Sequence, residues 1–248
     1  MYVDIIPDAG CITDEKVSGK NAVVIDVLRA TSVMCAALHN GARRIIPVTS
    51  VEQCVALYEH LSMRGEKVLR GGERNTYRIE GFELDNSPLA YTAEMVCGAT
   101  IVMTTTNGTR TINSCRLASE ILIGSLLNAS AVADYLVSRD SDVILVCSGR
   151  RNAYTMEDGY CAGLLASLLY EKCGADLSDL AWHERDFYSR YSENPREALE
   201  HCRHFCDIRE RLAADVEFCL QKNIFNIVPK VYTGEVYVDE GGCNQEIR

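Results

Sequence analysis

Short apolar runs alternate with amphipathic segments through about the first 170 residues of the chain. Continuous apolar runs bounded by polar and glycine residues predict buried β-strands, and the amphipathic segments between them predict helices. The predicted strands lie at 22–27, 44–48, 67–70, 100–104, 120–124 and 142–147. The predicted helices lie at about 31–40, 50–63, 87–98, from 109 onward, 128–138 and 158–172.

The last third of the chain has a different pattern. Residues 176–194 are polar, and we expect them to be irregular. One long helix is predicted from about 195 to 222, because its apolar positions share a single stripe. The alternation over 224–238 is typical of one or two short antiparallel strands.

The order of these elements predicts an α/β fold. Apolar strands separated by amphipathic helices indicate a three-layer α/β/α sandwich with a largely parallel, mixed sheet. A long C-terminal helix and short antiparallel strands complete the prediction. We expect a single compact unit over 1–248; two interlocked halves, about 1–120 and 121–248, are the alternative.

Charge and composition narrow the classes of partner. The chain has 25 Lys and Arg against 35 Asp and Glu, a formal net charge of −10. This balance disfavours a nucleic-acid partner, because duplex binding usually needs a basic face. It leaves room for a small anionic phosphorylated substrate, which a few local arginines can bind. Self-association into a homo-oligomer is left open by the sequence.

The expected compartment is the cytoplasm. No segment approaches the roughly 18 consecutive apolar residues of a membrane span, so no membrane partner is expected. The first residues lack the basic and apolar regions of a secretory signal. The twelve cysteines include no Cys-x-x-Cys pair, and we expect them to be thiols in a reducing environment.

Polar groups follow five of the predicted strands at their carboxyl ends. Ligands of open parallel sheets bind in the crevice at those ends, so we expect these groups to converge on one side of the sheet. They are Asp26, Arg29, Thr31 and Ser32; Gly71, Gly72, Glu73 and Arg74; Thr104, Thr105, Thr106, Asn107, Gly108, Thr109 and Arg110; Ser125 and Asn128; and Ser148, Glu157 and Asp158.

The segment 104–110 carries the sharpest signal. Small hydroxyl residues and a glycine at a helix start offer backbone N–H groups and hydroxyls to an anion, and Arg110 adds a planar donor fork. An ordinary capped turn explains the hydroxyls equally well. The segment is neither a Walker loop nor Gly-x-Gly-x-x-Gly, so it implies no nucleotide.

The acidic residues each allow two interpretations. Asp26 is either a metal ligand or nucleophile beside an anion-binding Arg29, or a helix cap that pairs with Arg29. Glu157 and Asp158 either supply oxygen ligands for Mg²⁺ or sit favourably at a helix N-terminus. Glu73 is either a ligand or the ion-pair partner of the adjacent arginine.

The segment His201–Cys206 superficially resembles a zinc site, with two histidines and two cysteines. Four ligands from one short helix cannot surround a tetrahedral ion. We therefore expect Cys202 and Cys206 in the core and both histidines on the surface. No histidine lies near the other motifs in sequence, which disfavours a phosphohistidine mechanism.

Taken together, these motifs resemble the ComB family, the 2-phosphosulfolactate phosphatases. Order and spacing match from about residue 22 to 172. Asp85 and Ser148 depart from the family's usual Gly and Ala, and neither change removes an expected ligand. The segments that carry the resemblance are 24–32, 72–74, 86–88, 104–110, 124–129 and 157–158, with 215–219 and 228–229 in the tail.

The resemblance implies an Mg²⁺-dependent hydrolase that converts 2-phosphosulfolactate to sulfolactate and phosphate, a step of coenzyme M biosynthesis. We expect the metal at Asp26, Glu73, Glu157 and Asp158, and catalytic roles for Asp26 and Arg29. The expected substrate-binding residues are Arg29, Thr31, Ser32, Arg74, Asn86, Ser87, Thr104, Thr105, Thr106, Asn107, Gly108 and Arg110. The alternatives are a phosphatase of another phosphorylated hydroxy acid and a non-catalytic binder of an anionic metabolite.

Overall fold

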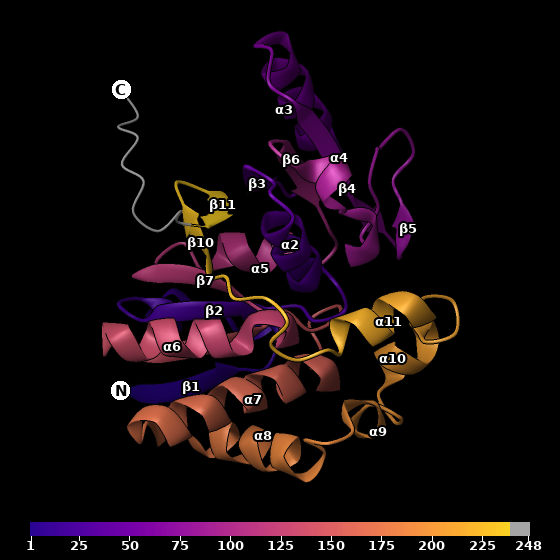
Figure 1. Cartoon of the computed structure of the whole chain (residues 1–248). Coiled ribbons are helices and arrows are strands. Elements are labelled where there is room, and N and C mark those ends of the chain that lie inside the picture. Colours follow the sequence, from indigo (N-terminus) through magenta and orange to yellow (C-terminus); the bar gives the residue numbers. More distant parts are fainter. Residues whose placement is uncertain (239–248) are drawn as a thin grey trace.

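One mixed sheet of eleven strands runs through residues 1–238, the part of the chain that this computed structural model describes (Figure 1). The strands are β1 (Tyr2–Ile6), β2 (Asn21–Ile25), β3 (Arg44–Pro47), β4 (Val68–Arg74), β5 (Tyr77–Arg78), β6 (Thr100–Thr104), β7 (Glu120–Gly124), β8 (Val143–Cys147), β9 (Asp176–Leu177), β10 (Pro229–Tyr232) and β11 (Glu235–Val238). Their order in the sheet is β5-β4-β6-β3-β11-β10-β7-β2-β8-β1-β9.

The sheet contains two parallel blocks joined by the C-terminal hairpin. Strands β4, β6 and β3 form one block, and β7, β2, β8, β1 and β9 form the other. The hairpin β10–β11 pairs antiparallel with β7 on one side and β3 on the other. Three antiparallel pairings separate β3 from β7, so the strands of one block run opposite to those of the other. The sheet twist of roughly 20–25° per strand accumulates between β4 and β2, and it turns the carboxyl ends of both blocks toward a shared region.

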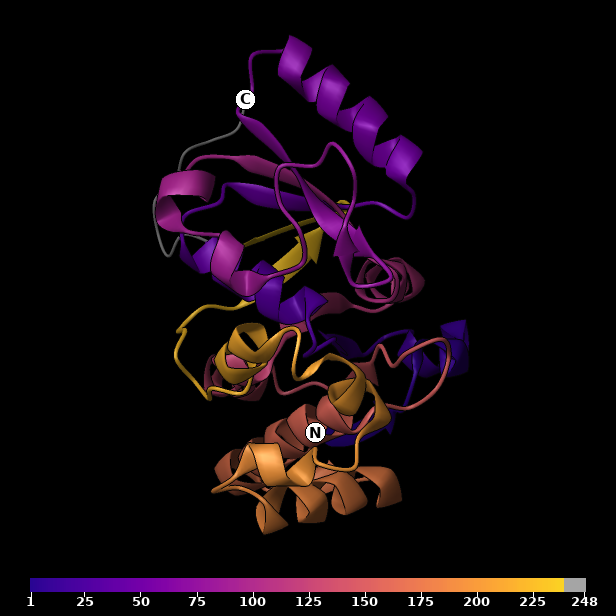
Figure 2. The same ribbon diagram turned by 90° about the vertical axis from the view of Figure 1, so that its right-hand side faces the viewer.

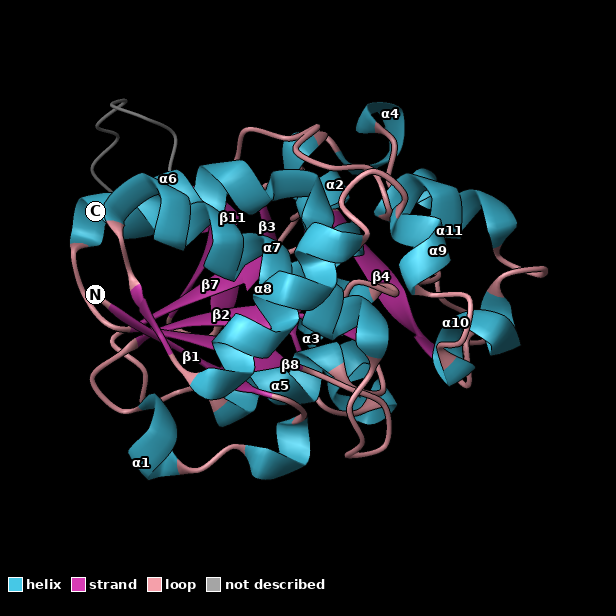
Figure 3. Ribbon diagram, turned by 90° about the horizontal axis from the view of Figure 1, so that it is seen from below, coloured by secondary structure: helices cyan, strands magenta, loops and turns pink. Residues whose placement is uncertain are grey.

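Helices cover both faces of the sheet, as Figure 3 shows from below. The helices are α1 (Asp14–Val17), α2 (Ala30–His39), α3 (Val51–Met63), α4 (Ala93–Val96), α5 (Gly108–Ser114), α6 (Ala129–Arg139), α7 (Met156–Cys173), α8 (Asp179–Arg190), α9 (Pro195–Ala198), α10 (Arg203–Ile208) and α11 (Ala213–Cys219). Short 3₁₀ turns lie at Ala9–Cys11, Pro88–Ala90 and Leu126–Asn128.

Two buried clusters hold the layers together. Val23 of β2 points into the cluster that contains α6, α7 and α8, and its neighbour Val24 points into the cluster that contains α2. Successive strand residues face opposite sides, so a continuous apolar strand serves both layers at once. The predicted layered α/β fold is confirmed. A smaller cluster packs α3 against β4 and β6.

The six predicted strands are all present, with ends shifted by a few residues, and the antiparallel tail is present as β10 and β11. The sequence prediction missed β1, in which Asp4 interrupts the apolar run. It was also wrong about 176–194, which forms β9 and the amphipathic helix α8. Ser178 caps that helix by accepting from the backbone N–H of Ala181.

The single long helix predicted over 195–222 is wrong. The segment forms three short helices, α9, α10 and α11. The last two lie between the α3 end and the α7–α8 end of the molecule, and α9 lies beside α8 (Figure 2). Cys202 starts the second of them, because its sulfur accepts from the backbone N–H of Phe205. The turns keep Cys202 and Phe205 in the core while Cys206, predicted to be buried, is exposed.

The helix predicted at 87–98 is likewise replaced by the 3₁₀ turn at Pro88–Ala90 and by α4. Within residues 1–238, no helix combines the length and the apolar character needed to cross a membrane.

Candidate active site

A cavity of about 190 Å³ opens where the carboxyl ends of β2 and β4 and the loop after β6 meet the C-terminal helices. The predicted residues Asp26, Arg29, Glu73, Asn86, Thr105, Thr106 and Asn107 line it. The sequence analysis did not assign the other polar residues of its wall, which include Asn75, Thr76, Arg150, Arg151, His204, Asp207 and Arg211. The expected convergence of strand ends is therefore confirmed for β2, β4 and β6.

Asp26 stands at the start of α2 with its carboxyl group on the cavity. Its Oδ1 accepts from the backbone N–H of Ala30 at 3.2 Å, which satisfies one free donor of that helix. Burial raises the pKa of Asp26 to about 6, and the charges of Glu73 and Glu157 act in the same direction. The Ala30 N–H and the charge of His204 partly oppose the rise. Asp26 thus accepts from the first N–H of α2 and also lines the cavity.

Gly108 allows the β6–α5 turn to approach Asp26 closely. A Cβ at this position would lie 2.9 Å from Asp26 Oδ2 and 2.6 Å from the Cβ of Ala30. Any side chain here would displace the carboxylate, so the glycine shapes the cavity through its lack of a side chain.

Arg29 does not pair with Asp26. Its guanidinium forms a buried ion pair with Asp215 of α11, whose other carboxylate oxygen accepts from Ser87 Oγ at 2.5 Å. Both partners of the ion pair are nearly inaccessible, with side chains 3% and 8% exposed. Asp215 therefore positions the arginine, and it was not identified as a site residue from the sequence.

Glu73 lies across the cavity from the N-terminus of α2. Its Oε1 accepts from the backbone N–H and the hydroxyl of Thr106 at 2.9 and 2.8 Å, and its Oε2 accepts from the N–H of Thr76 at 2.7 Å. Arg74 donates to the backbone carbonyl of Glu73 and to Thr104 Oγ1, not to the Glu73 carboxylate. These bonds tie β4 to the Thr-rich loop.

Glu157 and Asp158 lie in the first turn of α7, and their buried carboxylates form hydrogen bonds with other groups of the protein. Asp158 accepts from the N–H groups of Val27 and Gly149 at 2.9 and 3.0 Å and so joins two strand ends. Burial, together with the charges of Asp26 and Glu157, raises the pKa of Asp158 well above its usual value. Neither acid lines the cavity.

The Glu157 carboxylate is held by His204 and Cys202. Its Oε1 lies 2.5 Å from His204 Nδ1, and its Oε2 accepts from Cys202 Sγ at 2.9 Å. Burial works to raise the pKa of Glu157, but the hydrogen bond and charge of His204, with the Cys202 bond, outweigh it and leave the pKa lowered. The expectation that both histidines are surface residues is wrong for His204, whose side chain is 12% exposed. No histidine lies near the other motifs in sequence, but the fold brings His204 to the cavity that several of them line.

Several predicted binding residues have structural partners instead. Thr31 exchanges hydrogen bonds with the backbone of Asp26, and Ser32 donates to the carbonyl of Val27. Arg110 is exposed and donates to Asn152. None of these three residues lines the cavity, and neither do Arg74, Ser87, Thr104 and Gly108.

No group of three or more His, Cys, Asp or Glu side chains within residues 1–238 could hold a metal ion by itself. Mg²⁺ commonly binds through one or two carboxylates together with waters and a substrate phosphate. Asp26 and Glu73 face the same cavity and fit that requirement. Asn86 adds a buried amide oxygen on the cavity wall that has no hydrogen-bond partner in the described residues.

Within the zinc-like segment His201–Cys206, Cys202 is buried in the core. We expect Cys202→Ala to lower the free energy of unfolding by about 1–3 kcal/mol, because it removes a buried sulfur and one donor to Glu157. Denaturant unfolding measures the loss, and the exposed Cys206→Ala is the matched control. Stoichiometric zinc bound through these two thiols in purified protein would contradict this interpretation.

Comparison with known proteins agrees with the motifs. A family model described as 2-phosphosulpholactate phosphatase matches residues 10–234. A "Probable 2-phosphosulfolactate phosphatase" of Clostridium perfringens (strain 13 / Type A) is 39% identical over 248 residues, which cover 100% of both chains. Proteins of the same name from Clostridium acetobutylicum and Caldanaerobacter subterraneus are 39% and 38% identical over 95% of this chain and cover 100% and 98% of their own lengths. The chain therefore belongs to the 2-phosphosulfolactate phosphatase family, a family of phosphoric monoester hydrolases.

Proposed function

We propose that this protein hydrolyses 2-phosphosulfolactate to sulfolactate and phosphate with Mg²⁺, as a step of coenzyme M biosynthesis in the cytoplasm. One observation carries the proposal: a single cavity combines carboxylates suited to a divalent cation with arginines suited to a multiply charged anion. The relatives that cover the full chain bear this substrate in their names.

The charges on the cavity wall match the proposed substrate. Among residues 1–238, four arginines and three carboxylates line the cavity: Arg29, Arg150, Arg151 and Arg211 with Asp26, Glu73 and Asp207. A guanidinium binds phosphate, carboxylate or sulfonate through two parallel donors. Arg150 pairs with Asp207 at 2.6 Å and Arg211 donates to Thr76, so two of the arginines are already oriented.

Charge stabilisation must supply most of the rate, since phosphate monoesters hydrolyse extremely slowly without a catalyst. Arg29 is fixed by Asp215 before substrate binds, so it can stabilise the transferring phosphoryl group without reorganising. The amide of Asn86, whose oxygen has no partner in the described residues, offers a further polar contact on the same wall.

Asp26 and Glu73 are the proposed residues for holding Mg²⁺. When bound, the ion would polarise a phosphoryl oxygen and lower the pKa of an attacking water. The hydrogen bonds from Thr106 and Thr76 orient the Glu73 carboxylate, while the Ala30 N–H orients that of Asp26.

A substrate panel tests the proposal directly. Phosphate release should be fastest with 2-phosphosulfolactate, slower with 2-phospholactate and other phosphorylated hydroxy acids, and abolished by EDTA. A clear preference for another phosphorylated hydroxy acid would assign the enzyme to that ester. Binding of the ester without phosphate release would instead favour the metabolite-binding alternative.

Mg²⁺ is expected to raise the melting temperature. Asp26 and Glu73 repel each other across the cavity, and a cation that binds only the folded state stabilises it by about 2.7 kcal/mol at 100 times its Kd. For a chain of this size, that corresponds to roughly 5 °C or more. Thermal melts with Mg²⁺ and with Na⁺ at equal ionic strength measure the shift, which Asp26→Asn should abolish. Unchanged melting and unchanged activity on adding Mg²⁺ would remove the metal from the proposal.

One observation supports the proposed compartment, and self-association is a separate prediction. The eleven cysteines within residues 1–238 are free thiols, as a reducing compartment favours, while Cys243 lies outside the described residues. Self-association remains a prediction, which light scattering would test.

A further inference from the structure

His204 brings a histidine into the wall of the proposed active site. Its ring lines the cavity that also contains Asp26 and Arg29, although it comes from the C-terminal helices rather than from a strand end. His201, one turn earlier, is exposed and lines only a neighbouring hollow, which His204 also borders. The two histidines of the zinc-like segment therefore occupy different environments.

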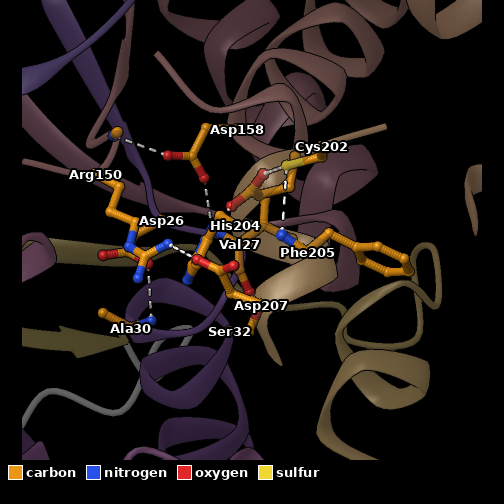
Figure 4. Close-up of polar contacts among 12 residues, drawn as sticks. Asp26, Val27, Ala30, Ser32, Arg150, Asp158, Cys202, His204, Phe205 and Asp207 are labelled. Carbon is orange, nitrogen blue, oxygen red and sulfur yellow. Dashed lines mark hydrogen bonds and ion pairs between the residues drawn. The ribbon is translucent and has the colours of Figure 1, made fainter. Parts of the chain in front are cut away.

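The ring of His204 is held through one nitrogen. Nδ1 lies 2.5 Å from Glu157 Oε1, and the Glu157 side chain is only 2% exposed. The second oxygen of Glu157 accepts from Cys202 Sγ, so both carboxylate oxygens have a partner. Figure 4 shows Cys202 and His204 in the same region as Asp26 and Asp158. The Glu157 carboxylate holds the proton on Nδ1 and stabilises the doubly protonated ring, in which the Nε2 proton is the one free to be transferred.

The charge of the His204 ring also reaches Asp26, one of the two residues proposed to hold the metal. The positive charge of His204 acts on Asp26 and opposes the effect of burial there. Asp207, three residues along α10, lines the same cavity and pairs with Arg150, so the approach to His204 is framed by a guanidinium. An anionic ester in the cavity would therefore meet a wall that contains both Asp26 and His204.

We infer that His204 is the general acid of the phosphatase reaction and donates the Nε2 proton to the ester oxygen of the departing alcohol, with Glu157 as its positioning residue. This inference rests on the proposed function, because it assigns a role within that reaction. A hydroxy-acid alkoxide leaves poorly, and a positioned general acid typically contributes about 10²–10⁴ in rate.

The atoms balance in one turnover. The oxygen of a water forms a bond to phosphorus, and the bond between phosphorus and the ester oxygen breaks with its electron pair on that oxygen. Nε2 gives its proton to this oxygen and yields the alcohol. The attacking water loses a proton, which restores the protonated ring, so the net change is R–O–PO₃²⁻ + H₂O → R–OH + HPO₄²⁻.

The test compares an ester whose leaving group needs a proton with an ester whose leaving group departs without one. His204→Asn should lower kcat for 2-phosphosulfolactate by about 10²–10⁴-fold with little change in KM. The same variant should lose much less activity on 4-nitrophenyl phosphate, whose phenolate departs without a proton. Glu157→Gln should lower kcat by roughly 10–100-fold, a size typical of a residue that orients a functional histidine. The matched control His201→Asn should behave as the wild type.

A merely structural role would lower activity on both esters equally. That result would overturn the inference, as would a loss confined to KM, wild-type kcat in His204→Asn, or a phosphorylated His204 trapped during turnover. If His204→Asn does not fold, a series of phosphate esters assayed with the wild-type enzyme tests the inference instead. A weak dependence of kcat/KM on leaving-group acidity across alkyl and aryl phosphates supports an acid, and a steep dependence overturns it. Failure of the proposed function is distinguishable, since the wild type would then release no phosphate from any hydroxy-acid ester.

Discussion

Asp26→Asn should lower kcat by about 10³-fold while leaving the protein as stable as the wild type or more so. The amide can still accept from the Ala30 N–H, but it can no longer hold a divalent cation or present a negative charge to the cavity. Steady-state phosphate release with 2-phosphosulfolactate measures the loss. Wild-type kcat/KM in this variant would remove Asp26 from the reaction.

The stability part of this prediction follows from the raised pKa of Asp26. The folded protein holds the proton up to a pKa of about 6, against a usual value of 3.8, so stability is lost as pH rises through this window. At pH 8 the ionised carboxylate therefore opposes folding. In EDTA at pH 8, Asp26→Asn should raise the free energy of unfolding by an amount on the order of 1–3 kcal/mol.

The control for Asp26→Asn is the same substitution at an exposed site. Asp134 of α6 is 64% exposed and pairs with Lys172, and neither residue lines the cavity. Asp134→Asn should change neither kcat nor stability by a measurable amount, because exposed ion pairs contribute little. At pH 4, where Asp26 is protonated in the folded state, the stability gain of Asp26→Asn should shrink markedly.

Arg29→Lys should lower kcat by about 10²-fold or more. Lysine keeps the charge beside Asp215 but loses the planar fork that can bind a phosphoryl group and a carboxylate at once. The loss should appear in kcat more than in KM, since the buried and fixed guanidinium is arranged for the transition state. A change confined to KM would assign Arg29 to ground-state binding.

The structure supplies a matched control for the arginine. Arg110 is exposed, bonds to Asn152 and does not line the cavity. The sequence motif predicted that it binds phosphate, but its position now predicts near wild-type kinetics for Arg110→Lys. A large rise in KM in Arg110→Lys would mean that substrate extends beyond the cavity. Circular dichroism and melting curves should confirm that both lysine variants fold normally.

The prediction from sequence was strongest where local pattern fixes structure. Strand and helix periodicity placed β2, β6, β7 and β8 and the helices after them, because backbone geometry alone determines which side chains share a face. It failed over 195–222, where a single apolar stripe is equally compatible with one long helix or with three short ones. The turns between those helices depend on the core that they cover.

Some features of the candidate site could likewise be predicted from the sequence, and others could not. The sequence pattern placed Asp26, Glu73 and the Thr105–Asn107 loop at strand ends, but it did not show that β2 belongs to a block that runs opposite to β4 and β6. Their ends meet because of the twist accumulated across the sheet. Only the tertiary structure decided that Glu157 orients His204 and that Asp215 holds Arg29, across 47 and 186 positions of the chain. The partner of a buried charge is chosen by whichever group the fold brings within hydrogen-bond distance, because a buried charge must be paired, and no local pattern encodes that choice.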